Sequence, residues 1–191
     1  MALSGELSEF CRNWRAKADL YSPENLRDAF DRFFTLYVVF NRLYAEAAFR
    51  LARRDARKLT QFRDSNASQD GVLQFCTARV LTDAWESNSN TKEALQQIVE
   101  HLRDGRFALK LDMVTGDPNP DADRALLAAL ESRGRTQRAK AGLAALYAVR
   151  CNMFHGHKGF DPIQLDLLRL ALLVLESTID VLHRALERDS G

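Results

Sequence analysis

Hydrophobic side chains recur along the chain at the three- and four-residue steps of an α-helix. The longest such stripe falls within residues 23–59 and comprises Phe30, Phe34, Tyr37, Asn41, Tyr44, Ala48 and Leu51. Ser22-Pro23-Glu24 predicts the start of this helix, because serine is a favoured N-cap and proline a favoured first helical residue. Asn41 lies in the middle of the stripe, where a buried amide needs hydrogen-bond partners.

The same spacing predicts two further long helices, at 136–155 and 161–187. Shorter helices are predicted at 6–20, 71–85, 91–102 and 121–130. Residues 104–120 are the least regular part, because alternating apolar residues allow a brief strand before the turn-forming residues Gly116–Pro120. Together these elements predict an all-α helical bundle. A chain of 191 residues with no internal repeat is expected to form a single domain, 1–191.

Composition narrows the choice of partners and compartment. The net charge of +1 excludes a global field that would attract nucleic acid or membrane, so any basic surface must be local. Cys11, Cys76 and Cys151 are odd in number and share no C-x-x-C spacing, which favours a reducing, cytoplasmic location over a disulfide framework. The most apolar run, Leu165–Leu175, is too short to span a bilayer, so we expect no membrane association.

One segment concentrates positive charge, because no acidic residue lies between Glu131 and Asp161. Its cationic and histidine side chains are Arg133, Arg135, Arg138, Lys140, Arg150, His155, His157 and Lys158. Phosphate is a natural partner of such a surface, which makes RNA a candidate ligand. The alternative is an ordinary solvated helix face, which is what most runs of charge turn out to be.

Two residues of this segment suggest phosphoryl chemistry. Arg150 lies on an apolar stripe between Tyr147 and Phe154, where an arginine is unfavourable unless it is paired. His155 follows at the predicted helix end, and histidine has a pKa suited to removing a proton from a ribose 2′-hydroxyl. A guanidinium can hold two phosphoryl oxygens while charge builds on them. Alternatively, Arg150 is a structural cation bonded to Asn41 or to a backbone carbonyl, and His155 is a helix C-cap.

The residues around this pair resemble a known family. Val149–Gly156, with the sequence VRCNMFHG, resembles the R-x4-6-H signature of the HEPN domain, which often reads VRNNLFHG. Phe40, Asn41 and Tyr44 resemble the F-N-x-x-Y segment of several HEPN subfamilies. The resemblance is confined to these two segments and does not extend to residues 63–120.

The resemblance implies a HEPN-like bundle that forms a homodimer with a composite site at the interface. Many members of the family are metal-independent endoribonucleases that act as toxins or in phage defence. By this resemblance Arg150, His155 and Asn152 would be catalytic, and Asn41 would lie beneath the site and orient it. The expected partners are RNA, a second copy of the chain, and an antitoxin or other regulatory protein. Neither a cofactor nor a metal is expected.

Two alternatives to this interpretation remain. His155, His157 and Asp161 could together suggest a metal site, although two histidines and one acid at a helix end are thin support for one. A non-catalytic HEPN-like module could bind RNA, a nucleotide or a protein through the same basic cleft. Cys151 favours this second alternative, because the residue directly after the arginine is usually polar in the family.

Overall fold

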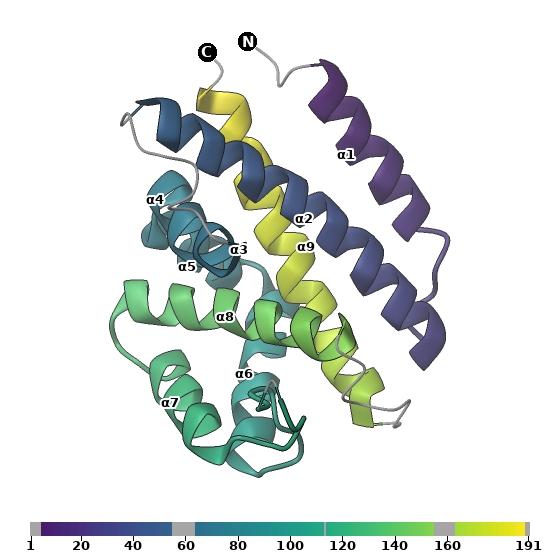
Figure 1. Cartoon of the computed structure of the whole chain (residues 1–191), viewed down its shortest axis with the longest axis vertical. Helices are drawn as coiled ribbons and strands as arrows, with labels where there is room; N and C mark the ends of the chain where they lie inside the picture. Colours follow the sequence, from purple (N-terminus) through teal and green to yellow (C-terminus); the bar gives the residue numbers. More distant parts are fainter. Residues whose placement is uncertain (1–4, 55–63, 113, 155–162, 190–191) are drawn as a thin grey trace.

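The computed structural model describes residues 5–54, 64–112, 114–154 and 163–189, and most of these residues are helical (Figure 1). The elements in chain order are α1 (Gly5–Ala18), α2 (Leu26–Arg54), α3 (Asp64–Asn66), the π-helical turn η2 (Ala67–Gly71), α4 (Val72–Cys76), α5 (Ala78–Ser87), α6 (Ser89–Arg103), α7 (Pro120–Leu130), α8 (Arg135–Phe154) and α9 (Ile163–Asp189). Over these ranges, β structure is limited to an isolated bridge between Leu111 and Pro118. The predicted all-α fold is confirmed.

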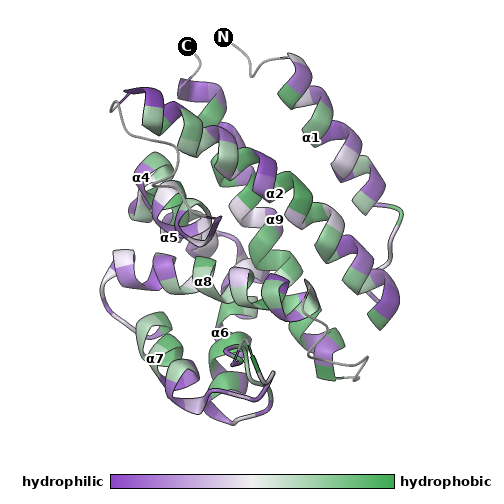
Figure 2. Ribbon diagram, viewed as in Figure 1, coloured by the Kyte–Doolittle hydropathy of each residue, from purple (hydrophilic) through white to green (hydrophobic). Residues whose placement is uncertain are grey.

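The two longest helices, α2 and α9, pack along each other and form the centre of the bundle (Figure 1). Both helices carry many apolar residues (Figure 2), and those that are buried belong to one hydrophobic core. Phe33 and Phe40 of α2 and Ile179 of α9 are completely buried. Burial of each such side chain stabilises the fold by about 1.5–3 kcal/mol. Helix α1 covers another side of α2, and α8 crosses the bundle next to α5 and α7.

The start of α2 differs from the predicted one. The N-cap is Asn25, whose Oδ1 accepts a hydrogen bond from the amide of Asp28 at 2.9 Å, and Ser22 lies in the turn before the helix. The carbonyl of Pro23 accepts a hydrogen bond at 2.8 Å from Nε of Arg169 on α9. Because a residue far away in the sequence holds this carbonyl, the tertiary contact keeps the Ser22–Pro23 turn outside the helix.

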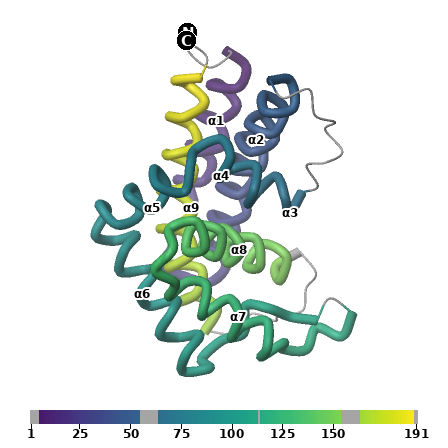
Figure 3. Tube along the Cα trace, turned by 90° about the vertical axis from the view of Figure 1, so that its left-hand side faces the viewer, coloured from purple at the N-terminus to yellow at the C-terminus, as the bar shows by residue number. Residues whose placement is uncertain are grey.

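The segment predicted as a single helix at 71–85 is divided at Thr77. Thr77 has a φ of 65°, a backbone conformation that interrupts the helical ladder. Its hydroxyl oxygen accepts a hydrogen bond from the amide of Val80 at 3.4 Å and so caps the start of α5. After this turn, α5 packs against α8 (Figure 3).

The long helices predicted at 136–155 and 161–187 are confirmed over the described residues, as α8 and α9. The irregular 104–120 segment is also confirmed, and it ends where α7 begins at Pro120. Its backbone is held by Asp123, whose Oδ1 accepts from the amides of Leu109 and Lys110 at 3.2 and 2.9 Å. No described helix combines the length and the apolar character that crossing a membrane requires.

Candidate functional site

Arg150 lies near the end of α8, and its side chain is 24% exposed. It lines a pocket of about 250 Å³ whose other walls come from α1 and α2. The pocket residues that matter below are Arg150, Phe10, Phe34, Tyr37, Val38 and Asn41, and we refer to this space as the Arg150 pocket. The predicted proximity of Asn41 and Arg150 is therefore present, since both side chains line one space.

The Arg150 guanidinium is surrounded by polar and aromatic groups. Its Nη2 lies 3.6 Å from Oδ2 of Asp64, which begins α3. The other carboxylate oxygen of Asp64 accepts a short hydrogen bond from the hydroxyl of Tyr44 on α2. The ring of Tyr147 lies beneath the guanidinium, 5.7 Å from its carbon to the ring centroid. Residues of α2, α3 and α8 thus meet at one polar cluster.

The environment keeps these groups in defined protonation states. Burial, followed by the charge of Asp64, raises the pKa of Tyr37. Burial and the hydrogen bond to Asp64 raise the pKa of Tyr44. Burial lowers the pKa of Arg150, but the contact with Cys151 and the charge of Asp64 outweigh it and raise this pKa. The site therefore presents a permanently charged guanidinium and two phenols that stay protonated at neutral pH, of which Tyr44 donates a hydrogen bond to Asp64.

Asn41 is not buried in the core, contrary to what its place on the apolar stripe suggests. It is half-buried, and Phe34 on the same stripe is 37% exposed. Four of the seven stripe residues are buried as expected, namely Tyr37, Tyr44, Ala48 and Leu51. Phe34 and Asn41 instead line the Arg150 pocket, so the stripe is part core and part pocket wall.

Asn152 lies apart from the Arg150 guanidinium. It is 7% exposed, and its Nδ2 donates a hydrogen bond to the carbonyl of Leu109 at 3.0 Å. Two residues along a helix correspond to a rotation of about 200°, so Asn152 and Arg150 lie on opposite sides of α8. In this structure the amide fastens the 104–119 segment to α8, and we assign Asn152 a structural role.

His155, His157 and Lys158 lie outside the described residues, and so does the metal alternative that was built on the two histidines. Phe154, the last described residue of α8, directly precedes His155 in the sequence. The proposed role of His155 thus stays a prediction. Across the part of the chain that the structure describes, no three His, Cys, Asp or Glu side chains cluster as a metal site would require.

Of the four described residues predicted to bind RNA, Arg133, Arg135, Arg138 and Lys140, all but Arg133 form ion pairs within the chain. Arg135 lies 2.7 Å from Asp83 and Arg138 lies 2.8 Å from Glu86, both on α5. Lys140 lies 2.7 Å from Asp70 of η2. The segment between Glu131 and Asp161 contains no acidic residue, but α5 and η2 bring carboxylates next to it in the folded protein.

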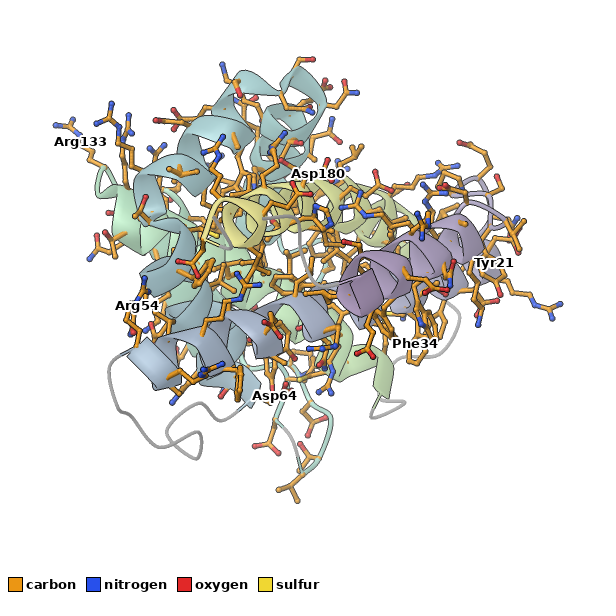
Figure 4. The ribbon with its side chains drawn as sticks, turned by 90° about the horizontal axis from the view of Figure 1, so that it is seen from above. Tyr21, Phe34, Arg54, Asp64, Arg133 and Asp180 are labelled. Carbon is orange, nitrogen blue, oxygen red and sulfur yellow. The ribbon has the colours of Figure 1, made fainter. Side chains whose placement is uncertain are left out.

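The basic residues are also remote from Arg150. Arg135 begins α8, about 22 Å along the helix axis from Arg150 at 1.5 Å per residue. Figure 4, seen from above, shows Arg133 on one side of the molecule and Phe34 and Asp64 on another. The structure therefore does not unite the predicted RNA-binding residues with the Arg150 pocket over the described range.

Sequence reasoning missed Asp64 and the roles of the two tyrosines. Tyr37 and Tyr44 lie on the predicted stripe, where the pattern predicts that aromatic residues belong to the hydrophobic core. Asp64 falls in a polar segment with no periodicity, so nothing in its local sequence points to Arg150.

Comparison with protein-family models, curated proteins and solved structures finds no match.

Proposed function

We propose that the protein is a metal-independent endoribonuclease in which Arg150 binds the scissile phosphate and His155 acts as the general base. The observation that supports this most strongly is the setting of Arg150. A charged, partly exposed guanidinium stands at the edge of a pocket, held by Asp64 and Tyr147, near the end of the helix that precedes His155. The sequence signature adds the histidine that such a site requires.

The reaction needs only proton transfer and charge stabilisation. His155 takes the proton of the ribose 2′-hydroxyl, and the 2′-oxygen attacks the adjacent phosphorus. The bond from phosphorus to the 5′-oxygen then breaks, and the departing oxygen takes up a proton. The Arg150 guanidinium binds two phosphoryl oxygens as negative charge develops on them. The products are a 2′,3′-cyclic phosphate and a 5′-hydroxyl end.

The proposed enzyme is a homodimer that joins along the outer face of α2. This face carries one stripe of half-buried and exposed residues, namely Phe34, Val38, Asn41, Ala45 and Phe49. Phe34 and Phe49 are 37% and 42% exposed, which is high for large aromatic side chains. Because the stripe borders the Arg150 pocket, a second copy seated on it would close the pocket and complete the site.

Cleavage of a labelled structured RNA in excess EDTA tests the proposal. We expect the wild type to produce 2′,3′-cyclic phosphate ends, and His155→Ala to be inactive. His183→Ala is the matched control, since it removes a histidine whose partner, Glu187, lies on the same helix, α9. Arg15→Ala serves likewise for Arg150→Ala, because Arg15 pairs with Asp180 at the surface. Absence of cleavage by the wild type on every RNA offered contradicts the proposal.

The neighbouring acids favour one second candidate, a module that binds a protein partner through the Arg150 pocket. Asp64 stands 3.6 Å from the guanidinium, and acids neutralise the basic residues of α8. A surface with both signs of charge suits a protein partner better than it suits a polyanion. The two candidates differ in the effect of His155→Ala, which abolishes cleavage in an enzyme and changes affinity only modestly in a binding module.

A further inference from the structure

The hydroxyl of Tyr37 is buried without a hydrogen-bond partner among the described residues. The residue is 3% exposed, and its ring packs edge-on against Phe40 with centroids 5.5 Å apart. An unpaired buried hydroxyl destabilises a fold by about 1–3 kcal/mol relative to a paired one. Phenylalanine would fill the same space without this penalty, so the hydroxyl calls for an explanation beyond packing.

The charges near this hydroxyl belong to the Arg150 cluster. Asp64 raises the pKa of Tyr37 and Arg150 lowers it, after the larger effect of burial, so both charges act on the phenol. Tyr37 also lines the Arg150 pocket, although its oxygen is covered. A ligand in the pocket therefore meets the guanidinium of Arg150 before it could meet this hydroxyl.

Asp64 faces two partners of different kinds in the ligand-free protein. The hydroxyl of Tyr44 donates to Oδ1, and the guanidinium of Arg150 lies 3.6 Å from Oδ2. A phosphate that draws Arg150 toward the pocket removes positive charge from Oδ2. The Asp64 side chain is 42% exposed, so water solvates part of its carboxylate, whereas the buried Tyr37 hydroxyl gains an acceptor if Oδ2 turns to it.

We infer that Tyr37 is a positioning residue whose hydroxyl binds the Asp64 carboxylate when Arg150 moves to bind a phosphate. This inference rests on the part of the proposed function in which Arg150 binds phosphate. In the ligand-free state the carboxylate is hydrogen-bonded by Tyr44 and paired with Arg150, and the Tyr37 hydroxyl has no described partner. In the bound state both phenols donate hydrogen bonds to the carboxylate, and the guanidinium binds the ligand. Both phenols stay protonated at neutral pH and can only donate to Asp64.

Two tyrosine-to-phenylalanine variants test the inference, because the structure gives them opposite consequences. Tyr44→Phe removes a hydrogen bond that exists without ligand, so the variant is less stable than the wild type. Its Tm falls by about 2–4 °C for each kcal/mol by which the free energy of unfolding decreases. Tyr37→Phe removes no such bond, so its ligand-free Tm is unchanged or higher. The Kd for inorganic phosphate, from the dependence of Tm on phosphate concentration, rises roughly tenfold in Tyr37→Phe. In an Asp64→Asn background, Tyr37→Phe changes the Kd for phosphate little further.

The outcomes separate this inference from the ribonuclease proposal. A loss of ligand-free stability in Tyr37→Phe, wild-type phosphate affinity in that variant, or phosphate binding that survives Arg150→Ala each overturns the inference. Cleavage of RNA that is indifferent to Tyr37→Phe also overturns it, while the ribonuclease proposal stands. Phosphate affinities that follow the expected order, with no cleavage of any RNA, support the inference and count against the enzyme.

Discussion

The ring of Trp85 lies directly against the backbone of Gly142, so that a Cβ on Gly142 would stand 2.7 Å from the ring carbon Cη2. The ring is 3% exposed, and its Nε1 donates a hydrogen bond to the hydroxyl of Thr178 at 3.2 Å. Trp85 belongs to α5, Gly142 to α8 and Thr178 to α9. This contact ties α8, the helix that carries Arg150, to the rest of the bundle.

We expect Gly142→Ala to lower the free energy of unfolding by about 1–3 kcal/mol, because the added methyl group overpacks a contact with a buried ring. Urea denaturation followed by tryptophan fluorescence measures the change. Gly134→Ala is the control, since its Cβ would meet only the flexible side chains of Gln137 and Ser132, at 3.1 and 3.4 Å. Equal stability of the two variants would contradict the packing assigned to Gly142.

Asn152→Ala tests whether Asn152 is structural. The substitution leaves the carbonyl of Leu109 unpaired, so we expect a loss of about 1–3 kcal/mol in unfolding free energy. Hydrogen exchange at residues 109 and 110 should accelerate, since that segment loses one of its attachments to the helices. Asn90→Ala, at an exposed position of α6, is the control and should change little. A variant that keeps wild-type stability but loses RNA cleavage would restore the catalytic role predicted from the sequence.

The basic residues of α8 should contribute little to RNA affinity. Arg135 already pairs with Asp83 at 2.7 Å, so Arg135→Ala is expected to change the Kd for RNA by no more than about twofold. Arg150→Ala should weaken binding by at least tenfold, because it removes the proposed phosphate ligand. Fluorescence anisotropy over a range of salt concentrations measures both. A steep fall in affinity for Arg135→Ala would show that RNA competes with Asp83 for this side chain.

Phe34→Glu should dissociate the proposed homodimer. The glutamate places a charge on the outer stripe of α2, and burying it against a second copy is unfavourable. Sedimentation analysis should show a dimer for the wild type and a monomer for this variant, with helical content unchanged. Leu20→Glu is a matched control, because Leu20 is 80% exposed and lies outside the stripe. A monomeric wild type would exclude the composite site.

The cysteines should differ in reactivity toward alkylation. Burial raises the pKa of Cys11, and it raises that of Cys76 to about 12, so neither presents a thiolate in the folded protein. Cys151 is half-buried beside Arg150. Iodoacetamide at pH 8 should therefore modify Cys151 first, as peptide mass spectrometry can show. Bound phosphate or RNA should slow that reaction if the ligand occupies the Arg150 pocket.

The raised pKa of Cys76 also predicts how stability depends on pH. An unfolded thiol ionises near its ordinary pKa of 9.0, whereas burial raises the pKa of the folded one to about 12. The unfolded state therefore loses a proton first as pH rises. The contribution of Cys76 to stability is complete below pH 9 and is lost progressively between pH 9 and 12. Cys76→Ala should have a shallower loss of stability over this range, measured by urea denaturation at several pH values.

Local sequence determined the helices and the irregular segment, because three- and four-residue periodicity reflects which side of a helix is buried. The long helices at α8 and α9 and the turn-rich 104–120 segment were predictable on this basis. The position of Asn41 near Arg150 was also predictable, from the two motifs that carry the resemblance. The helices and the irregular segment depend mainly on residues close together in the chain, whereas the proximity of Asn41 and Arg150 was an expectation from the resemblance alone.

Only the tertiary structure decided which charges meet. Arg169 of α9 holds the carbonyl of Pro23 and thereby shifts the start of α2. Asp83 and Asp70 neutralise basic residues of α8 that lie far away in the sequence. Asp64 lies 3.6 Å from Arg150, although the two are 86 positions apart in the sequence. Ion pairs and hydrogen bonds between distant residues leave no periodic pattern in the sequence, because they depend on how the helices pack and not on the order of neighbouring side chains.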